Sequence, residues 1–157
     1  KEKVKFFPKL RISLRIILMY LNRFLTISGI LPFLIILVLS LFQIYPMPLD
    51  YQFIFSAYSV IIISFIAGSH WGIAKNISNG KRIKIESNLI ALIAWACILW
   101  DSIYAWVVVI LCFIYLQYID FRLRNKSYIS QYYYQSRLLA TSCVVVIITI
   151  FNLLASN

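Results

Sequence analysis

The stretch Tyr58-Ser-Val-Ile-Ile-Ile-Ser-Phe-Ile-Ala-Gly-Ser-His-Trp-Gly-Ile-Ala-Lys75 decides the fold, because it is a long apolar run that also contains the only histidine. Its length and hydropathy predict a helix that crosses the hydrocarbon core of a bilayer, which is about 30 Å thick. Ser64, Gly68 and Gly72 recur every four residues, so they share one face of this helix. Small residues on one face let another helix approach closely, and we predict that this face packs against a partner helix.

His70 lies on a different face of the same predicted helix. Residues advance by about 100° each, which places His70 about 200° around the helix from Gly68. An ionisable side chain within a membrane helix is a candidate for a proton relay or a ligand contact. The alternative is structural, because a histidine near the end of a span can bond to headgroups, water or a neighbouring loop. Its position about one turn from the end of the span favours this structural role.

The composition predicts an integral membrane protein. Of the 157 residues, 62% are hydrophobic and only 13% are charged, whereas soluble domains are about half apolar and about a quarter charged. The net charge of +10 is clustered between apolar runs, so it indicates membrane topology rather than nucleic-acid binding. The three cysteines lie in separate apolar runs without a Cys-x-x-Cys spacing, which predicts buried free thiols, no metal site and no cofactor.

The apolar runs predict an all-α integral membrane protein with about five transmembrane helices, preceded by an N-terminal amphipathic interfacial helix. We expect a basic N-terminal segment, residues 1–23, and a single helical transmembrane domain, residues 24–157. The expected spans are residues 24–45, 53–74, 88–100, 103–119 and 138–154. Gly29 and Pro32 lie in the first span, where the proline predicts a kink.

The run from Leu89 to Ile119 is apolar except for Asp101 and Ser102, and it is too long for one upright span. A hairpin at Trp100-Asp101-Ser102 would place every basic segment on the same side of the membrane. The tendency of basic loops to stay on the inner side therefore favours five spans, with the N-terminus inside and the C-terminus outside.

Basic side chains at the membrane surface predict contacts with anionic phospholipid, with cardiolipin as one candidate. The residues expected to reach the headgroups are Lys9, Arg11, Arg15, Arg122 and Arg124. The tyrosines near residues 128–134 fit an interfacial aromatic belt better than a platform for stacking bases. We therefore expect no nucleic-acid partner.

Several segments together resemble the domain-of-unknown-function family to which mitochondrial transmembrane protein sixty-nine belongs, and which also occurs in proteobacterial inner membranes. The matching segments are Gly29-Ile-Leu-Pro-Phe33, Tyr58 through Ser64-Phe-Ile-Ala-Gly-Ser-His-Trp-Gly72, Leu92-Ile-Ala-Trp95, Gln117 with Asp120, and Tyr133 with Arg137 and Thr141. The chain departs from the family pattern at Asp101, where proline-rich connections are usual, and at Tyr132-Tyr-Tyr134, where a Trp-Tyr pair is usual. The resemblance implies a helical inner-membrane protein and no established reaction.

Four polar residues are candidates for a function inside the membrane: His70, Gln117, Asp120 and Arg137. Asp120 is most simply a capping ion pair that ties the following basic loop to its helix. A proton pathway that uses Asp120 and His70 is the alternative. The chain has no nucleophile-and-base pattern, phosphate loop or paired carboxylates, so we expect no enzyme activity and no catalytic residues.

These observations favour a non-catalytic inner-membrane protein that packs against other subunits, with an accessory or assembly role in a respiratory-chain complex. The packing residues would be Ser64, Gly68, Gly72, Gly29 and Pro32. The expected location is the mitochondrial inner membrane, with the N-terminus in the matrix and the C-terminus in the intermembrane space. The alternative location is a bacterial inner membrane with a cytoplasmic N-terminus. The alternative function is a small transporter or channel in which His70, Gln43, Gln117 and Asp120 line a path.

Overall fold

The computed structural model describes residues 20–21, 23–42, 50–78, 80–100 and 102–155, and all regular structure in these segments is helical. The helices are α2 (Leu31–Leu41), α3 (Tyr51–Ala74), α4 (Gly80–Ile98), α5 (Ile103–Asn125) and α6 (Gln131–Ala155). The stretches Arg23–Leu41, Tyr51–Ala74, Tyr104–Asn125 and Gln131–Leu154 are long and apolar enough to cross a membrane. The fifth expected span, residues 88–100, lies within α4, which is not among these four. The amphipathic helix expected within residues 1–23 falls largely outside the described residues.

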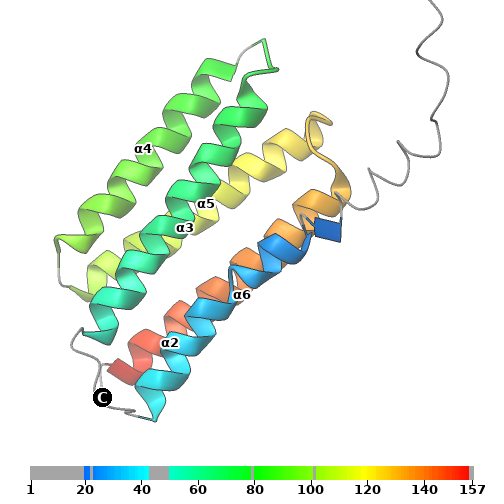
Figure 1. Ribbon diagram of the computed structural model, residues 1–157. Coiled ribbons are helices and arrows are strands. Elements are labelled where there is room, and N and C mark those ends of the chain that lie inside the picture. Colours follow the sequence, from blue (N-terminus) through cyan, green and yellow to red (C-terminus); the bar gives the residue numbers. More distant parts are fainter. Residues whose placement is uncertain (1–19, 22, 43–49, 79, 101, 156–157) are drawn as a thin grey trace, which may run out of the picture.

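The helices form a bundle of two layers, as Figure 1 shows. The front layer contains α4, α3 and α2 side by side, and α5 and α6 lie behind it. The most extensive helix contact is between α3 and α4, and α5 contacts α3, α4 and α6. This arrangement places α3 and α5 at the centre of the bundle, where their side chains can meet residues from every other helix.

The predicted kink in the first span is confirmed. Residues 23–28 are helical, a turn follows at Gly29 and Ile30, and α2 starts at Leu31 with Pro32 in its first turn. Proline has no N–H to donate to the carbonyl four residues earlier, so the helix ladder is interrupted at this point. The Tyr58 hydroxyl of α3 donates to the Gly29 carbonyl oxygen at 3.0 Å, which anchors the turn to the neighbouring helix.

The predicted hairpin near Asp101 is also confirmed by the helix boundaries. α4 ends at Ile98 and α5 starts at Ile103, after the Ser102 side chain caps its first turn by accepting from the Tyr104 N–H. Asp101 itself lies outside the described residues, as do Gln43 and residues 46–48 of the first turn. Because consecutive helices run in opposite directions, the basic residues near positions 75–86 and 122–137 gather at one end of the bundle. We call this the basic end.

Aromatic side chains hold the opposite half of the bundle together. The rings of Phe55 and Phe151 stack with centroids 4.2 Å apart, and Phe33 meets Phe55 edge-on at 5.3 Å. Trp106 adds an edge contact to Phe55 at 5.7 Å. These four rings come from α2, α3, α5 and α6, so one aromatic cluster joins most of the helices.

Small residues mediate the tight α3–α4 contact, but they are not the predicted ones. The buried residues of α4 are Gly80, Ser87 and Ala94, which are spaced by seven and therefore lie on one face. A Cβ atom on Gly80 would lie only 2.0 Å from the Ala74 carbonyl oxygen. Close helix approach in this protein therefore depends on the face of α4 that starts at Gly80.

The face of Ser64, Gly68 and Gly72 does not pack against any described part of the chain. All three residues are exposed, and a Cβ atom on Gly68 or Gly72 would meet no atom of the described residues within 4 Å. Periodicity correctly grouped these residues on one face, but it cannot tell which face of a helix its neighbours cover.

Three helices begin or end beyond the predicted spans. α4 starts at Gly80 rather than residue 88, α5 continues to Asn125 rather than ending at residue 119, and α6 starts at Gln131 rather than residue 138. Charged residues that we expected in loops therefore lie on helical turns. Hydropathy marks where a helix becomes apolar, whereas its hydrogen bonds continue into the polar turns beyond.

Candidate functional site: a buried polar cluster

The only histidine lies against a carboxylate inside the bundle. His70 Nε2 of α3 is 2.9 Å from Asp120 Oδ1 of α5, and both side chains are completely buried. Helical periodicity turns His70 to the same side of α3 as the buried Ile63, Ile66 and Ala67. The expected contact of His70 with headgroups or a loop is therefore wrong, because its partner is the facing helix.

Arg137 of α6 brings a positive charge to the same carboxylate. Its Nη2 lies 3.1 Å from Asp120 Oδ2, and its side chain is only 7% exposed. The contact is an ion pair rather than an aligned hydrogen bond, since Asp120 Oδ2 has no hydrogen-bond partner among the described residues. The face of Tyr133 covers the guanidinium, with the Arg137 Cζ atom 5.8 Å from the ring centroid.

A second polar contact lies beside this pair, where Thr141 Oγ1 donates to Gln117 Oε1 at 3.3 Å. Gln117 precedes Asp120 on α5, and Thr141 follows Arg137 by one turn of α6. We call His70, Asp120, Arg137, Gln117 and Thr141 the polar cluster. It therefore contains all four residues that we predicted as functional candidates, together with one that we had noted only within the resemblance.

The polar cluster links three helices that are distant in the sequence. The predicted ion pair of Asp120 is present, with Arg137 as its partner, but this partner lies on α6 rather than in a loop. Asp120 therefore joins α5 to α3 and α6 and does not cap a loop. Removing charges from water is costly unless each is paired, and an arginine and a carboxylate in contact satisfy this condition. The cluster can therefore fasten α3, α5 and α6 at the basic end, while the aromatic cluster fastens the other end.

The cluster leaves some hydrogen-bonding capacity unused. His70 Nδ1, Gln117 Nε2 and Arg137 Nε are buried without a hydrogen-bond partner among the described residues. Buried polar atoms are usually satisfied, and exceptions are typical of functional sites or of positions occupied by water. These unpaired polar atoms are the feature of the cluster that the transporter or channel alternative would require.

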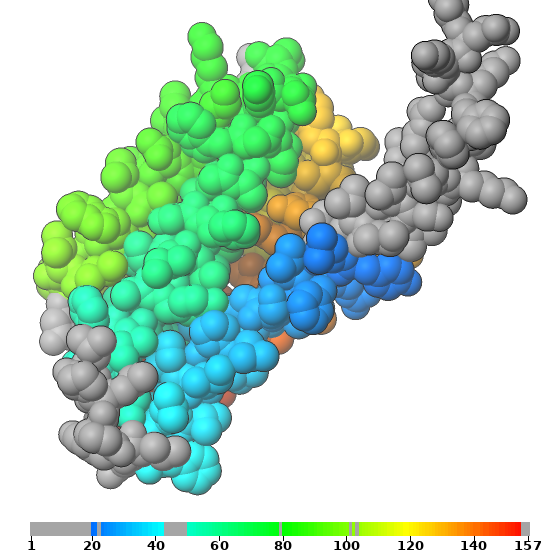
Figure 2. Space-filling view, viewed as in Figure 1, coloured from blue at the N-terminus to red at the C-terminus, as the bar shows by residue number. Residues whose placement is uncertain are grey.

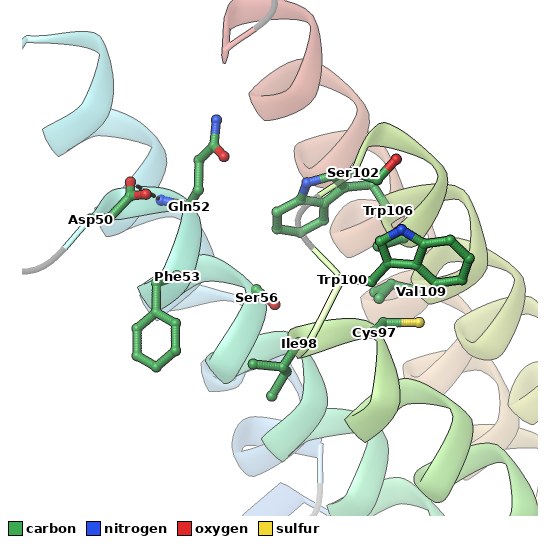
Figure 3. A pocket seen from close by; sticks show the side chains of 11 residues that line it. Asp50, Gln52, Phe53, Ser56, Cys97, Ile98, Trp100, Ser102, Trp106 and Val109 are labelled. Carbon is green, nitrogen blue, oxygen red and sulfur yellow. Dashed lines mark hydrogen bonds between the residues drawn. The ribbon is translucent and has the colours of Figure 1, made fainter.

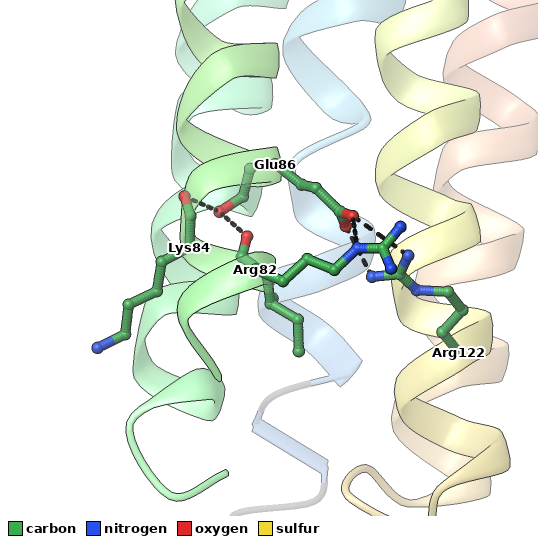
Figure 4. Close-up of polar contacts among 6 residues, drawn as sticks. Arg82, Lys84, Glu86 and Arg122 are labelled. Atoms are coloured by element: carbon green, nitrogen blue, oxygen red, sulfur yellow. Dashed lines mark hydrogen bonds and ion pairs between the residues drawn. The ribbon is translucent and has the colours of Figure 1, made fainter. Parts of the chain in front are cut away.

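Another set of charges joins α4 to α5 nearer the surface, as Figure 4 shows. Glu86 accepts from Arg122 Nη2 at 2.6 Å and from Arg82 Nε at 2.6 Å. Partial burial tends to raise the pKa of Glu86, but the hydrogen bonds from Arg122 and Arg82 outweigh burial and lower the pKa below its usual value. Glu86 was not among the predicted site residues, although its spacing of four from Arg82 was a readable signal.

Two of the residues expected to bind headgroups, Arg122 and Arg124, have partners within the protein. Arg122 is paired with Glu86 and lies over the Tyr118 ring, and Arg124 lies 5.5 Å above the Tyr134 ring centroid. The other three, Lys9, Arg11 and Arg15, fall outside the described residues. The lipid contact of all five stays a prediction.

Replacing Glu86 with glutamine should lower the stability of the protein at neutral pH. It should also make that stability depend less on pH in the acidic range. A carboxylate whose pKa is lowered by folding stabilises the fold above its unfolded pKa, here about 4.5, and this stabilisation is lost as the pH falls through the folded pKa. Thermal unfolding in detergent between pH 3 and pH 7 measures this effect. The unfolding temperature of wild type should exceed that of Glu86→Gln at neutral pH, and this difference should shrink below about pH 4.5.

The two arginines provide the matched comparison for that experiment. The Arg82 side chain is 78% exposed and that of Arg122 is 25% exposed, so Arg122→Gln should cost more stability than Arg82→Gln. Equal effects of the two substitutions, or a pH-independent difference for Glu86→Gln, would contradict this role of Glu86.

A cavity of about 210 Å³ lies at the opposite end of the bundle, between the start of α3, the end of α4 and the start of α5. Figure 3 shows its lining, which includes Cys97, Trp100 and Trp106. Two of its polar side chains are engaged in capping, since Asp50 accepts from the Gln52 N–H and Ser102 from the Tyr104 N–H. Within the described segments, no group of three or more His, Cys, Asp or Glu residues could hold a metal ion.

Comparison with known proteins identifies the family but no reaction. A family model described as a protein of unknown function (DUF3429) matches residues 21–153. No curated protein and no solved structure matches the chain. Because the match covers the helical domain from its first helix almost to the end of α6, the chain belongs to the DUF3429 family of proteins of unknown function.

Proposed function

We propose that this protein is a non-catalytic accessory or assembly subunit that packs against the helices of other subunits in a membrane complex. The observation that carries this proposal is the exposed face of Ser64, Gly68 and Gly72 on α3. In a bilayer, helices associate mainly through close packing of small residues, because burying apolar side chains away from lipid gains little. A small-residue face that the bundle leaves uncovered is suited to a helix from another chain.

The surroundings of this face support the proposal. α3 lies between α4 and α2 on the front layer, so an incoming helix would meet a broad surface rather than a single exposed helix (Figure 2). Phe65 and Trp71 of α3 are 74% and 48% exposed beside the glycines, and they could pack on a partner. The polar cluster and the aromatic cluster hold the bundle at both ends, which would keep this surface rigid.

The finer parts of the proposal rest on the resemblance to the transmembrane protein sixty-nine family. We propose the mitochondrial inner membrane as the location, with the N-terminus in the matrix, and a respiratory-chain complex as the host. A bacterial inner membrane with a cytoplasmic N-terminus is the alternative location. The small size and the aromatic-rich apolar surface of the chain fit a peripheral subunit of such a complex.

The transporter alternative is favoured by one observation, the convergence of His70, Gln117 and Asp120 inside the bundle. A carrier needs its polar residues to face a cavity that water or substrate can enter. His70 and Asp120 are both 0% exposed, so the cluster fits a fastening between helices better than a transport path.

The proposal is tested by the size and composition of the complex that the tagged protein forms in its native membrane. After extraction in mild detergent, the wild type should migrate on a native gel in a band well above its 18.3 kDa chain mass. Mass spectrometry of that band should identify electron-transport subunits. The double variant Gly68→Leu/Gly72→Leu should migrate as a free protein, because its leucines occupy the space reserved for the partner helix.

The control is Cys143→Leu, which adds bulk at an exposed position of α6 on the other layer. It should leave the complex intact. The glycine variant should also keep its unfolding temperature, since nothing in the described segments lies within 4 Å of either added Cβ. A wild type that migrates alone, or equal disruption by both variants, would overturn the proposed subunit role.

A further inference from the structure

A lateral cleft opens between the first helix and α3. In Figure 2, residues 23–30 in blue and α3 in green separate toward the basic end, and α6 in orange forms the floor between them. The inner part is a cavity of about 90 Å³. The bond from the Tyr58 hydroxyl to the Gly29 carbonyl, 3.0 Å long, holds the two walls together near its inner part.

The inner cavity is almost entirely apolar. Its walls include Leu25 and Ile30 from the first helix, Ile62 and Phe65 from α3, and Val144 from α6. The exposed side chains of Leu25 and Phe65 show that it opens sideways, toward the region that lipid chains would occupy. A cavity of this kind suits a hydrocarbon chain and offers little to a soluble anion.

The outer part of the cleft adjoins the inner part and is the more polar of the two. A second cavity of about 160 Å³ shares Thr26 with the first, and its lining includes Arg23, Ser130, Tyr133 and Ser136. Ser130 directly precedes α6, and Ser136 lies near the start of that helix. This part of the cleft therefore lies at the basic end. The lining of the cleft therefore becomes less polar from the basic end toward the interior of the bundle.

The charges that line the cleft are positive. Arg23 lines the outer cavity and Arg137 lines the inner one, and no Asp or Glu in the described part of the chain lines either cavity. Among the described residues, no carboxylate lies within ion-pair distance of Arg23. Arg137 shares its charge with Asp120, but its buried Nε has no hydrogen-bond partner in the described part of the chain.

From this gradient we infer that the cleft binds one anionic phospholipid, with an acyl chain in the inner cavity and the phosphate beside Arg23 in the outer cavity. The inference is independent of the proposed subunit role. It also differs from the expected surface contacts of Arg122 and Arg124, because neither of these two described residues lines the cavities. A basic residue near the membrane surface strengthens the binding of an anionic headgroup by about fivefold.

Native mass spectrometry of the full chain in detergent tests this inference with three probes: phosphatidylglycerol, phosphatidylcholine and the soluble glycerol 3-phosphate. Wild type should bind phosphatidylglycerol about fivefold more tightly than phosphatidylcholine and should not retain glycerol 3-phosphate. Arg23→Gln, at an exposed position, should remove the preference while retaining both lipids. Ala140→Leu, which fills the inner cavity from α6, should weaken the binding of both lipids.

Each variant has a matched control outside the cleft. Lys126→Gln removes a charge from the same end of the bundle, and Ala96→Leu adds the same bulk on the exposed face of α4. Both should bind lipid like wild type. The inference would be overturned if wild type bound the two lipids equally or retained glycerol 3-phosphate. It would also be overturned if the controls lost lipid to the same extent as the cleft variants. If Ala140→Leu bound both lipids like wild type, the lipid would bind elsewhere and the cleft would have another occupant. That result would also overturn the inference.

Discussion

Replacing Asp120 with alanine should lower the free energy of unfolding by about 3–5 kcal/mol, the largest effect that we expect from a single substitution in this chain. The change would leave Arg137 charged, 7% exposed and without a carboxylate, and it would remove the only described partner of His70. An uncompensated charge inside the bundle costs much more than a lost surface ion pair. Asp120→Asn should have a smaller effect, because an amide preserves the shape of the site and can still bond to His70.

Reversible unfolding in mixed micelles, followed by tryptophan fluorescence, measures this loss. Asp50→Ala is the matched control, because it also removes a carboxylate but only from the N-cap of α3, and it should cost about 1 kcal/mol. The double variant Asp120→Ala/Arg137→Met should recover much of the lost stability, since removing both charges leaves none unpaired. An Asp120→Ala effect no larger than that of Asp50→Ala would contradict the fastening role of the polar cluster.

Replacing Gly80 with alanine should lower the free energy of unfolding by about 1–3 kcal/mol, the usual range for an overpacked contact. The added methyl group would lie 2.0 Å from the carbonyl oxygen of Ala74. That atom belongs to the backbone at the end of α3, so it cannot move aside as the tip of a flexible side chain could. The substitution should therefore push α4 away from α3 at their shortest connection.

Gly72→Ala is the matched control for Gly80→Ala, because no described residue lies within 4 Å of a Cβ atom at Gly72. Alanine favours the helix over glycine by up to about 1 kcal/mol, so the control should be neutral or slightly stabilising for the isolated chain. The same unfolding measurement applies to both variants. If the two substitutions changed the free energy of unfolding equally, the close contact at Gly80 would not determine the stability of the α3–α4 connection.

Much of the fold was predictable because hydropathy and helix-breaking residues such as proline determine structure locally. The turn before Pro32, the hairpin near residue 101 and the position of His70 opposite Gly68 follow from proline chemistry, span length and helical periodicity. The clustering of basic residues at one end followed from the order of the helices. None of these features requires knowledge of which helix touches which.

The features that were missed depend on contacts between helices. His70 and Asp120 were considered together only as an alternative, because their contact joins residues 50 positions apart and no pattern in one sequence reports that distance. Both α3 and α4 have small residues at helical spacing, but only the set starting at Gly80 is buried. Glu86 lay in a stretch that we expected to be a loop, so its link between α4 and α5 could not be foreseen.

The placement of charges along the chain has a consequence for how the protein enters its membrane. Asp120 and Arg137 belong to the consecutive helices α5 and α6, whereas His70 belongs to the earlier pair of α3 and α4. A newly made α5–α6 hairpin can thus enter the lipid with its carboxylate and guanidinium already compensating each other, which avoids carrying a lone charge across. The imidazole arrives on a separate hairpin and can dock afterwards. Biogenesis would then proceed as the joining of two hairpins, each of which tolerates the bilayer before they meet.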